Sequence, residues 1–266
     1  MASSFDKLSS IGRKTDEGDE FTPLRADRLV SGISGFESLS QGGFKINSVN
    51  LLSGAPGTGK SIFAMQFLMA GIYQGDTGIY ISFEEPKESF FANMLSFGWD
   101  LKRYEKEGKL LYVEYTPEQV EKIISEGGGL LATSVERANA TRLVVDSISS
   151  FLLLDTNELS KRESALALFK MIRKWKLTTI LTDEHATFSG NDDQRSTSAI
   201  EFETDSILLL SNNQPDLRSE RQRYIEILKM RGTNHIRRPS PYLITPKGIE
   251  IYPKGYFDDK GTLIRG

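Results

Sequence analysis

The feature that most constrains the fold is a glycine-rich string. It follows an apolar segment, SVNLLSG, and precedes a segment with the pattern of an amphipathic helix. The string matches G-x-x-x-x-G-K-[ST] and reads Gly54-Ala55-Pro56-Gly57-Thr58-Gly59-Lys60-Ser61. A functional match needs a strand before it and a helix after it, and both are present. We therefore predict a P-loop, whose backbone amides and Lys60 hold phosphates and whose Ser61 hydroxyl ligates magnesium. A glycine-rich turn that matches by chance is the alternative.

Apolar segments alternate with helix-like segments along most of the chain. Strands are predicted at SVNLLSG, TGIYISF, KLLYVEY, TRLVVDSIS and LTTILTD, and helices after Lys60, over residues 91–97, over 117–139 with a break at 127–129, and over 163–176. This order predicts an α/β fold with a mainly parallel central sheet flanked by helices. The later runs DSILLLSN, RYIEILKMRG, SPYLIT and KGIEIYP have no long helix between them, so they predict C-terminal antiparallel strands.

The length and composition fit one large domain with short tails. The chain has 266 residues, 38% of them hydrophobic and 26% charged, so it can bury a core but has little room for a second domain. We expect a flexible N-terminal tail over residues 1–27, a catalytic domain over 28–253 and a C-terminal extension over 254–266. The absence of cysteine excludes disulfides, thiolate metal sites and cysteine nucleophiles.

Charge and hydropathy bear on partners and location. A net charge of -3 argues against a surface devoted to nucleic acid, although a local basic patch remains compatible with it. The N-terminus lacks the apolar core of a signal peptide, and the longest apolar stretch, residues 62–73, is too short to cross a bilayer. We therefore expect a cytoplasmic protein without membrane insertion. His185 and His235 have no metal-ligand spacing, so no zinc site is expected.

Polar residues end three of the predicted parallel strands. Asp146 ends LVVD and is a candidate magnesium residue, although an aspartate that caps a turn would look the same. Glu84 and Glu85 follow TGIYISF, where one of them is a candidate to activate the attacking water and a solvated strand end is the alternative. Thr182 ends LTTILT, beside Asp183 and Glu184, and is a candidate sensor of the terminal phosphate.

Two cations lie near the end of RYIEILKMRG. Lys229 and Arg231 are two residues apart on a predicted strand and so project to one face. A solvated strand face is one reading of the pair. The other is a pair of cations that reaches the terminal phosphate of a neighbouring molecule.

Several strings together resemble a known family. GISGFESLSQGGF, SGAPGTGKS, IYISFEE, SFGWDL followed by EGKL, LVVDSISS and ILKMRGTNH occur in this order over roughly residues 28–253. The chain thereby resembles the KaiC branch of the RecA-like ATPases, as a single KaiC repeat. The resemblance implies a RecA-like P-loop core that binds ATP and Mg²⁺, hydrolyses ATP to ADP and phosphate, and forms a homo-hexameric ring with regulatory or signalling function.

The resemblance also implies roles for single residues. Glu84 and Glu85 match the catalytic glutamate pair, and Asp146 matches the acidic position of the magnesium site. Lys229 and Arg231 match the cations that reach across a subunit boundary. Thr233 and His235 match further residues of that segment.

The KaiC branch also includes a clock protein with two repeats, one of which phosphorylates itself. This chain departs from that repeat at the phosphate acceptors. Alignment on Thr204 and Asp205 places Glu201 and Phe202 where that repeat has a Ser-Thr pair. Residues 196–198 offer hydroxyl groups close by. We therefore expect ATP hydrolysis without autokinase activity.

Two other functions remain open. A RadA-like recombination ATPase would bind single-stranded DNA through the loops LLLDTNELSKR and HATFSGNDDQRSTS, but neither loop interleaves basic and aromatic residues. A nucleotide-gated assembly scaffold of the FlaH type would hydrolyse ATP slowly, and the Glu84–Glu85 pair argues against it. DNA is thus a partner that the sequence permits without favouring, and the downstream protein partner is not indicated.

Overall fold

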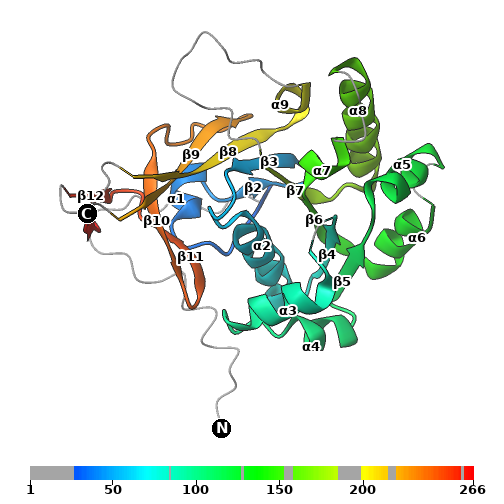
Figure 1. The fold of residues 1–266 in the computed structure, drawn as a ribbon, viewed down its shortest axis with the longest axis horizontal. Coiled ribbons are helices and arrows are strands. Elements are labelled where there is room, and N and C mark those ends of the chain that lie inside the picture. Colours follow the sequence, from blue (N-terminus) through cyan, green and yellow to red (C-terminus); the bar gives the residue numbers. More distant parts are fainter. Residues whose placement is uncertain are drawn as a thin grey trace.

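A nine-stranded sheet runs through the centre of the computed structural model (Figure 1). The structure describes residues 27–83, 85–126, 129–152, 158–184, 199–214, 220–258 and 261–266. In spatial order the strands are β11 (Gly248–Ile251), β10 (Ser240–Thr245), β9 (Gln222–Met230), β8 (Ser206–Asn213), β3 (Val49–Gly54), β7 (Thr178–Asp183), β6 (Ala140–Asp146), β4 (Thr77–Ser82) and β5 (Leu110–Glu114).

The sheet is mixed, with its two kinds of pairing separated along the chain. The strands from β8 to β5 in this order pair parallel to one another. The pairs β8–β9, β9–β10 and β10–β11 are antiparallel. The prediction of a parallel core with antiparallel C-terminal strands is therefore confirmed. All parallel strands end at one edge of the sheet, which we call the carboxyl edge, and begin at the opposite, amino edge.

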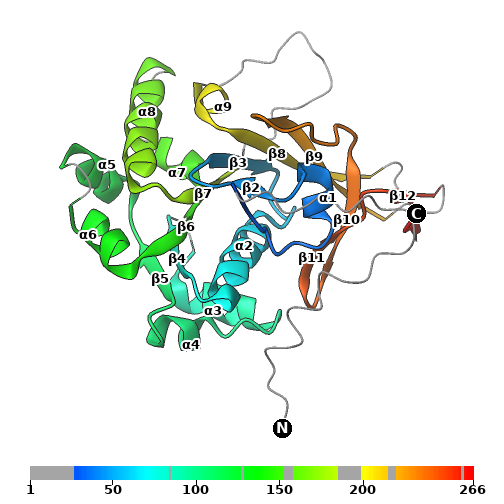
Figure 2. The ribbon, with the colours of Figure 1, turned by 180° about the vertical axis from the view of Figure 1, so that it is seen from behind.

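Helices cover both faces of the parallel strands (Figures 1 and 2). One face carries α2 (Lys60–Gln74), α3 (Lys87–Leu95) and α4 (Leu101–Lys106), and the other carries α5 (Pro117–Ser125), α6 (Gly129–Ala138), α7 (Ile148–Leu152) and α8 (Glu158–Trp175). Side chains alternate along each strand, so Leu52 packs in the core under α2 while Leu51 packs in the core under α8. Two separate hydrophobic cores result, one on each face.

Helix α5 begins and ends at residues that the sequence marks as helix boundaries. A capping box of Thr116 and Gln119 starts α5, and α5 ends before the glycines at 127–129, as predicted. Shorter elements that the sequence does not announce are α1 (Phe36–Ser40), α9 (Ala199–Glu203), and the strand pairs β1 (Arg28–Leu29) with β2 (Phe44–Lys45) and β12 (Tyr256–Phe257) with β13 (Leu263–Ile264). Two-residue strands are too short for a detectable period.

The N-terminal region folds against the same core that supports α2. Phe36 of α1 and Phe44 of β2 stack with ring centroids 4.8 Å apart, and both rings meet Phe63 of α2 edge to face. This packing fixes the first turns of α2 in the core that it shares with the sheet. Among the described residues, no helix is long and apolar enough to cross a membrane.

Candidate functional site

The predicted P-loop connects β3 to α2 and is held closed by its own side chains. Thr58 Oγ1 donates to Ala55 O at 2.8 Å, and Lys60 Nζ donates to Gly54 O at 2.8 Å across the loop. Gly59 has φ 92°, a left-handed conformation that a larger residue would adopt only under strain. The loop therefore curls around the ammonium of Lys60, and the residue as a whole is 7% exposed.

Strands β8 and β10 contact the P-loop and hold it in place. Tyr242 of β10 donates its hydroxyl proton to Thr58 O at 2.5 Å. A Cβ atom at Gly54 would lie 2.6 Å from Leu210 O of β8, so the close approach of β3 and β8 also requires glycine there. The C-terminal strands thus set the position of the phosphate loop.

A cavity of about 300 Å³ opens beside this loop at the carboxyl edge. Its lining comes from the P-loop and from the ends of the neighbouring parallel strands: Pro56, Gly57, Gly59, Lys60, Ser61, Ile62, Ser82, Glu85, Asp146 and Glu184. Parallel strands end together, which is why residues distant in sequence meet here. The structure therefore brings the P-loop, Asp146 and Glu85 to one cavity, as the sequence predicts.

Asp146 is oriented by two buried hydroxyl groups. Tyr80 OH donates to one carboxylate oxygen and Thr182 Oγ1 donates to the other. Burial raises the pKa of Tyr80 well above its ordinary value, and the nearby Asp146 charge raises it further, so Tyr80 remains a proton donor. Thr182 is fully buried and acts on Asp146, and it is not among the residues that line the cavity.

The oxygen atoms at this cavity fit a magnesium ion. Ser61 contributes a hydroxyl group and Asp146 a carboxylate, and both line the same cavity. The described residues contain no group of three or more His, Cys, Asp or Glu side chains that could hold a metal by themselves. Mg²⁺ commonly binds through one or two protein oxygens together with waters and substrate phosphates, so a partial set of this kind suits it.

Of the two candidate water-activating carboxylates, the structure describes only Glu85. Glu84 lies outside the described residues. Glu85 lines the cavity, and its Oε1 accepts hydrogen bonds from Ser89 Oγ at 2.9 Å and Asn93 Nδ2 at 2.8 Å, both from α3. Glu184, which follows Thr182 and Asp183 in sequence, also lines the cavity, and its backbone amide donates to Ser149 Oγ at 2.9 Å.

Lys229 and Arg231 lie together at the other end of the sheet. Lys229 Nζ donates to Glu201 O at 2.8 Å, and Arg231 Nη2 donates at 2.7 Å to Phe202 O, which also accepts from Lys229 at 3.2 Å. Partial burial lowers the pKa of Lys229, and the Arg231 charge lowers it further. Both cations reach Phe202 O of α9, although only Lys229 lies on β9 and Arg231 follows its end at Met230.

The strand register places these cations away from the cavity. Met230 pairs with Ser206, Ser206 pairs with Asn50, and Gly54 at the start of the P-loop pairs with Leu210. Asn50 and Gly54 are four residues apart on β3, which corresponds to ~13 Å along a strand. Lys229 and Arg231 therefore lie at the amino edge, and the P-loop lies at the carboxyl edge.

Thr233 and His235 follow at the same amino edge. Arg28 Nη2 donates to Thr233 Oγ1, and His235 Nδ1 lies 3.3 Å from Thr233 O. Ile236 N donates to Leu39 O at 3.0 Å, which ties this segment to α1. Neither Thr233 nor His235 lines the cavity beside the P-loop.

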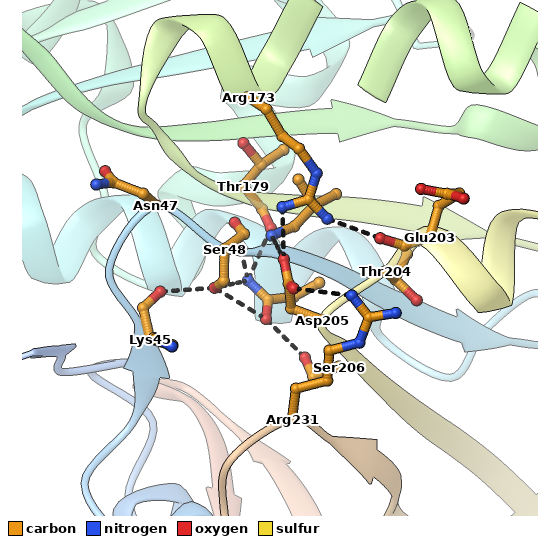
Figure 3. Close-up of polar contacts among 12 residues, drawn as sticks. Lys45, Asn47, Ser48, Arg173, Thr179, Glu203, Thr204, Asp205, Ser206 and Arg231 are labelled. Atoms are coloured by element: carbon orange, nitrogen blue, oxygen red, sulfur yellow. Dashed lines mark hydrogen bonds and ion pairs between the residues drawn. The ribbon is translucent and has the colours of Figure 1, made fainter. Parts of the chain in front are cut away.

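Sequence reasoning missed two supporting residues. Tyr80 stands inside an apolar strand, where it reads as a core residue, and only the structure shows its hydroxyl on Asp146. Arg173 of α8 ion-pairs with Asp205 at 3.1 Å and donates to Glu203 O at 2.7 Å (Figure 3). Nothing in the local sequence connects Arg173 with Asp205.

Known proteins with similar sequence and structure agree on one family. The model of the ATPase family KaiC matches residues 29–256. The circadian clock oscillator protein KaiC of Synechococcus elongatus is 36% identical over 236 residues, which is 84% of this chain and 44% of that protein. The chain thus spans less than half the length of the clock proteins that it matches.

Shorter archaeal proteins match over nearly their full length. The UPF0273 protein of Aeropyrum pernix is 33% identical over 85% of this chain and 94% of its own length. The crystal structure of a KaiC-like protein from Pyrococcus horikoshii superposes with a TM-score of 0.73 at 37% identity, and covers 87% of this chain and 100% of its own. The chain therefore belongs to the KaiC family of ATPases, and residues 29–256 correspond to one KaiC domain.

Proposed function

We propose that this protein is a ring-forming, ATP-hydrolysing regulatory ATPase whose active site is shared between neighbouring copies, in a homo-hexamer. The observation that carries the proposal is the separation of the two groups of functional side chains. The cavity with Lys60, Ser61 and Asp146 lies at the carboxyl edge, whereas Lys229 and Arg231 lie at the amino edge of the same sheet. These cations can serve a nucleotide only if it is bound to another copy.

At the carboxyl edge, the P-loop amides and Lys60 bind the β- and γ-phosphates of ATP. Ser61 and Asp146 hold the magnesium ion, which supplies positive charge to the phosphate oxygens. Tyr80 and Thr182 act through Asp146 by fixing its carboxylate orientation. Glu84 and Glu85 provide the carboxylate that positions the attacking water and accepts its proton.

At the amino edge, Lys229 and Arg231 of one copy approach the γ-phosphate bound by the next. Positive charge from a positioned arginine stabilises the transition state of phosphoryl transfer and is worth about 10³–10⁵ in rate. Arg231 is 54% exposed at its side chain, which leaves it accessible to another molecule. Thr233 and His235 continue the same segment and would extend the contact.

The proposal is tested by mixing two inactive variants. Lys60→Ala removes the P-loop cation but keeps the amino edge, and Arg231→Ala does the opposite. A mixed ring contains some boundaries with an intact P-loop on one side and an intact Arg231 on the other, and neither variant forms such a boundary alone. We expect the mixture to hydrolyse ATP faster than the sum of the two separate rates.

The mixture must be measured in assemblies that exchange subunits, followed by fluorescence transfer between labelled copies. A mixture of Lys60→Ala with the double variant Lys60→Ala/Arg231→Ala is the matched control, because it contains no intact P-loop. If every mixing ratio gives only the sum of the separate rates, the shared site is wrong and Lys229 and Arg231 are surface charges.

A further inference from the structure

Asp205 occupies the junction between β8 and the cation pair, and its polar atoms are engaged on every side (Figure 3). Its backbone amide donates to Val49 O at 2.7 Å, and its carbonyl accepts from Arg231 N at 2.8 Å. Its Oδ2 accepts from Val49 N at 2.9 Å and from Arg173 Nη1 at 3.1 Å. Its Oδ1 lies 3.5 Å from Arg231 Nη1.

The contacts with Val49 and Arg173 hold the Asp205 carboxylate in place independently of Arg231. Val49 is the first residue of β3, the strand that ends in the P-loop, so Asp205 is anchored to the centre of the sheet. Arg173 comes from the last turn of α8 and also donates to Glu203 O at 2.7 Å, which holds α9 beside the same carboxylate. Asp205, just before β8, is therefore an acceptor held by contacts to β3 and α8.

Arg231 is held from three directions as a result. Its backbone amide is bonded to Asp205 O, its Nη1 faces Asp205 Oδ1, and its Nη2 donates to Phe202 O. An exposed arginine without such partners samples many rotamers, and this freedom must be lost when it engages a phosphate. Ion pairs at this level of exposure contribute little to folding stability. The main consequence of the Asp205 contact is the direction in which the guanidinium points.

We propose that Asp205 is a positioning residue that fixes the Arg231 guanidinium for the triphosphate of a neighbouring copy. The inference rests on the proposed shared active site. It adds separate roles at the amino edge: Arg231 contacts the phosphate, and Asp205 orients the Arg231 guanidinium. Phe202 O, on α9, completes the same support.

The test places Asp205→Asn in one or the other partner of the mixing experiment. Asparagine keeps the size of the side chain and an oxygen acceptor for Val49 N, but removes the charge that faces Arg173 and Arg231. In the first mixture, Lys60→Ala/Asp205→Asn is combined with Arg231→Ala, so the change lies in the chain that supplies Arg231. In the second, Lys60→Ala is combined with Arg231→Ala/Asp205→Asn, so it lies in the chain that supplies the P-loop.

We expect the first mixture to lose about tenfold in kcat relative to the mixture without Asp205→Asn, equivalent to about 1.4 kcal/mol of transition-state stabilisation. The second mixture should keep its rate within about twofold, and KM for ATP should be the same in both. Glu203→Gln in place of Asp205→Asn removes a nearby charge and leaves Asp205 intact, so it should keep the reference rate.

Equal losses in the two mixtures would assign Asp205 a purely structural role and overturn the inference. An undiminished rate in the first mixture would overturn it as well, while the restored activity of the reference mixture would leave the shared site standing. If the reference mixture itself shows no restored activity, the shared site fails and the role of Asp205 fails with it.

Discussion

The two edges of the central sheet hold their functional cations in opposite ways. At the carboxyl edge, Lys60 is 7% exposed and its ammonium is bonded to Gly54 O, within the same loop. At the amino edge, the Arg231 side chain is 54% exposed and is held by Phe202 of α9 and by Asp205, just before β8. The first edge encloses its charge, whereas the second directs its charge outward. The first arrangement suits a ligand bound within one chain, and the proposed shared site would use the second.

Lys60→Ala should give the largest effect, because it removes the enclosed cation around which the loop is built. ATP binding should be lost and hydrolysis should fall to background. Equilibrium binding of a fluorescent ATP analogue measures the first quantity and phosphate release the second. Arg231→Ala is the matched variant, since it removes a cation at the other edge and should leave ATP affinity within about twofold of the parent. Near-normal ATP affinity in Lys60→Ala would contradict the P-loop assignment.

Replacing Glu84 and Glu85 by glutamine, singly and together, should give the next largest effect. Glutamine keeps the shape of the side chain but cannot accept the proton of the attacking water, so hydrolysis should slow by about 10²–10⁴ while ATP remains bound. Single-turnover kinetics with bound ATP separates the two properties.

Glu88→Gln is the control for these variants, because Glu88 is an exposed residue in the first turn of α3. It should hydrolyse ATP at the parental rate. If the double variant at 84 and 85 also keeps that rate, the base lies elsewhere at the carboxyl edge. Glu184, which lines the same cavity, would then be the residue to replace.

The carboxyl edge could be predicted from sequence because its signals are local. The P-loop is one continuous string, and Asp146 and Glu85 each follow an apolar run that already reads as a strand. Parallel pairing then brings the strand ends together without any further information. One predicted boundary is wrong: the run TRLVVDSIS predicts a single strand, whereas β6 ends at Asp146 and α7 begins at Ile148. The apolar residues of α7 are buried, so their helical turn looks like a continued strand.

The amino edge could be predicted only in part. The spacing of Lys229 and Arg231 indicates a common face, and both do reach Phe202 O. Their acceptors, however, come from α9 and from Asp205, just before β8, and these contacts form only when the sheet and its covering helices have assembled. No pattern of charge or hydropathy around Arg173 announces its pairing with Asp205. Long-range polar contacts of this kind depend on side-chain positions that the period of a sequence does not encode.

The smallest effect should appear as a change in pH dependence at the amino edge. Partial burial and the Arg231 charge lower the pKa of Lys229, so this lysine loses its proton at a lower pH than a free lysine, whose pKa is about 10.4. Below that pH both cations are present, and above it only Arg231 remains charged. Because kcat/KM reports the ionisation of the free enzyme, in which no triphosphate lies beside Lys229, we expect kcat/KM for ATP to decline by roughly threefold on the alkaline side, which corresponds to less than ~1 kcal/mol of transition-state stabilisation.

Lys229→Arg tests this directly, because arginine stays charged throughout the same pH range. The kcat/KM of Lys229→Arg, normalised to its own maximum, should stay level where the parental profile falls. The parental loss of activity at high pH cannot result from unfolding caused by deprotonation of Lys229. Its lowered native pKa means that the unfolded chain binds more protons in this window, so the contribution of Lys229 to the free energy of unfolding rises with pH. If the two normalised profiles coincide, Lys229 does not act as a cation in the reaction, and Arg231 alone carries the function of the amino edge.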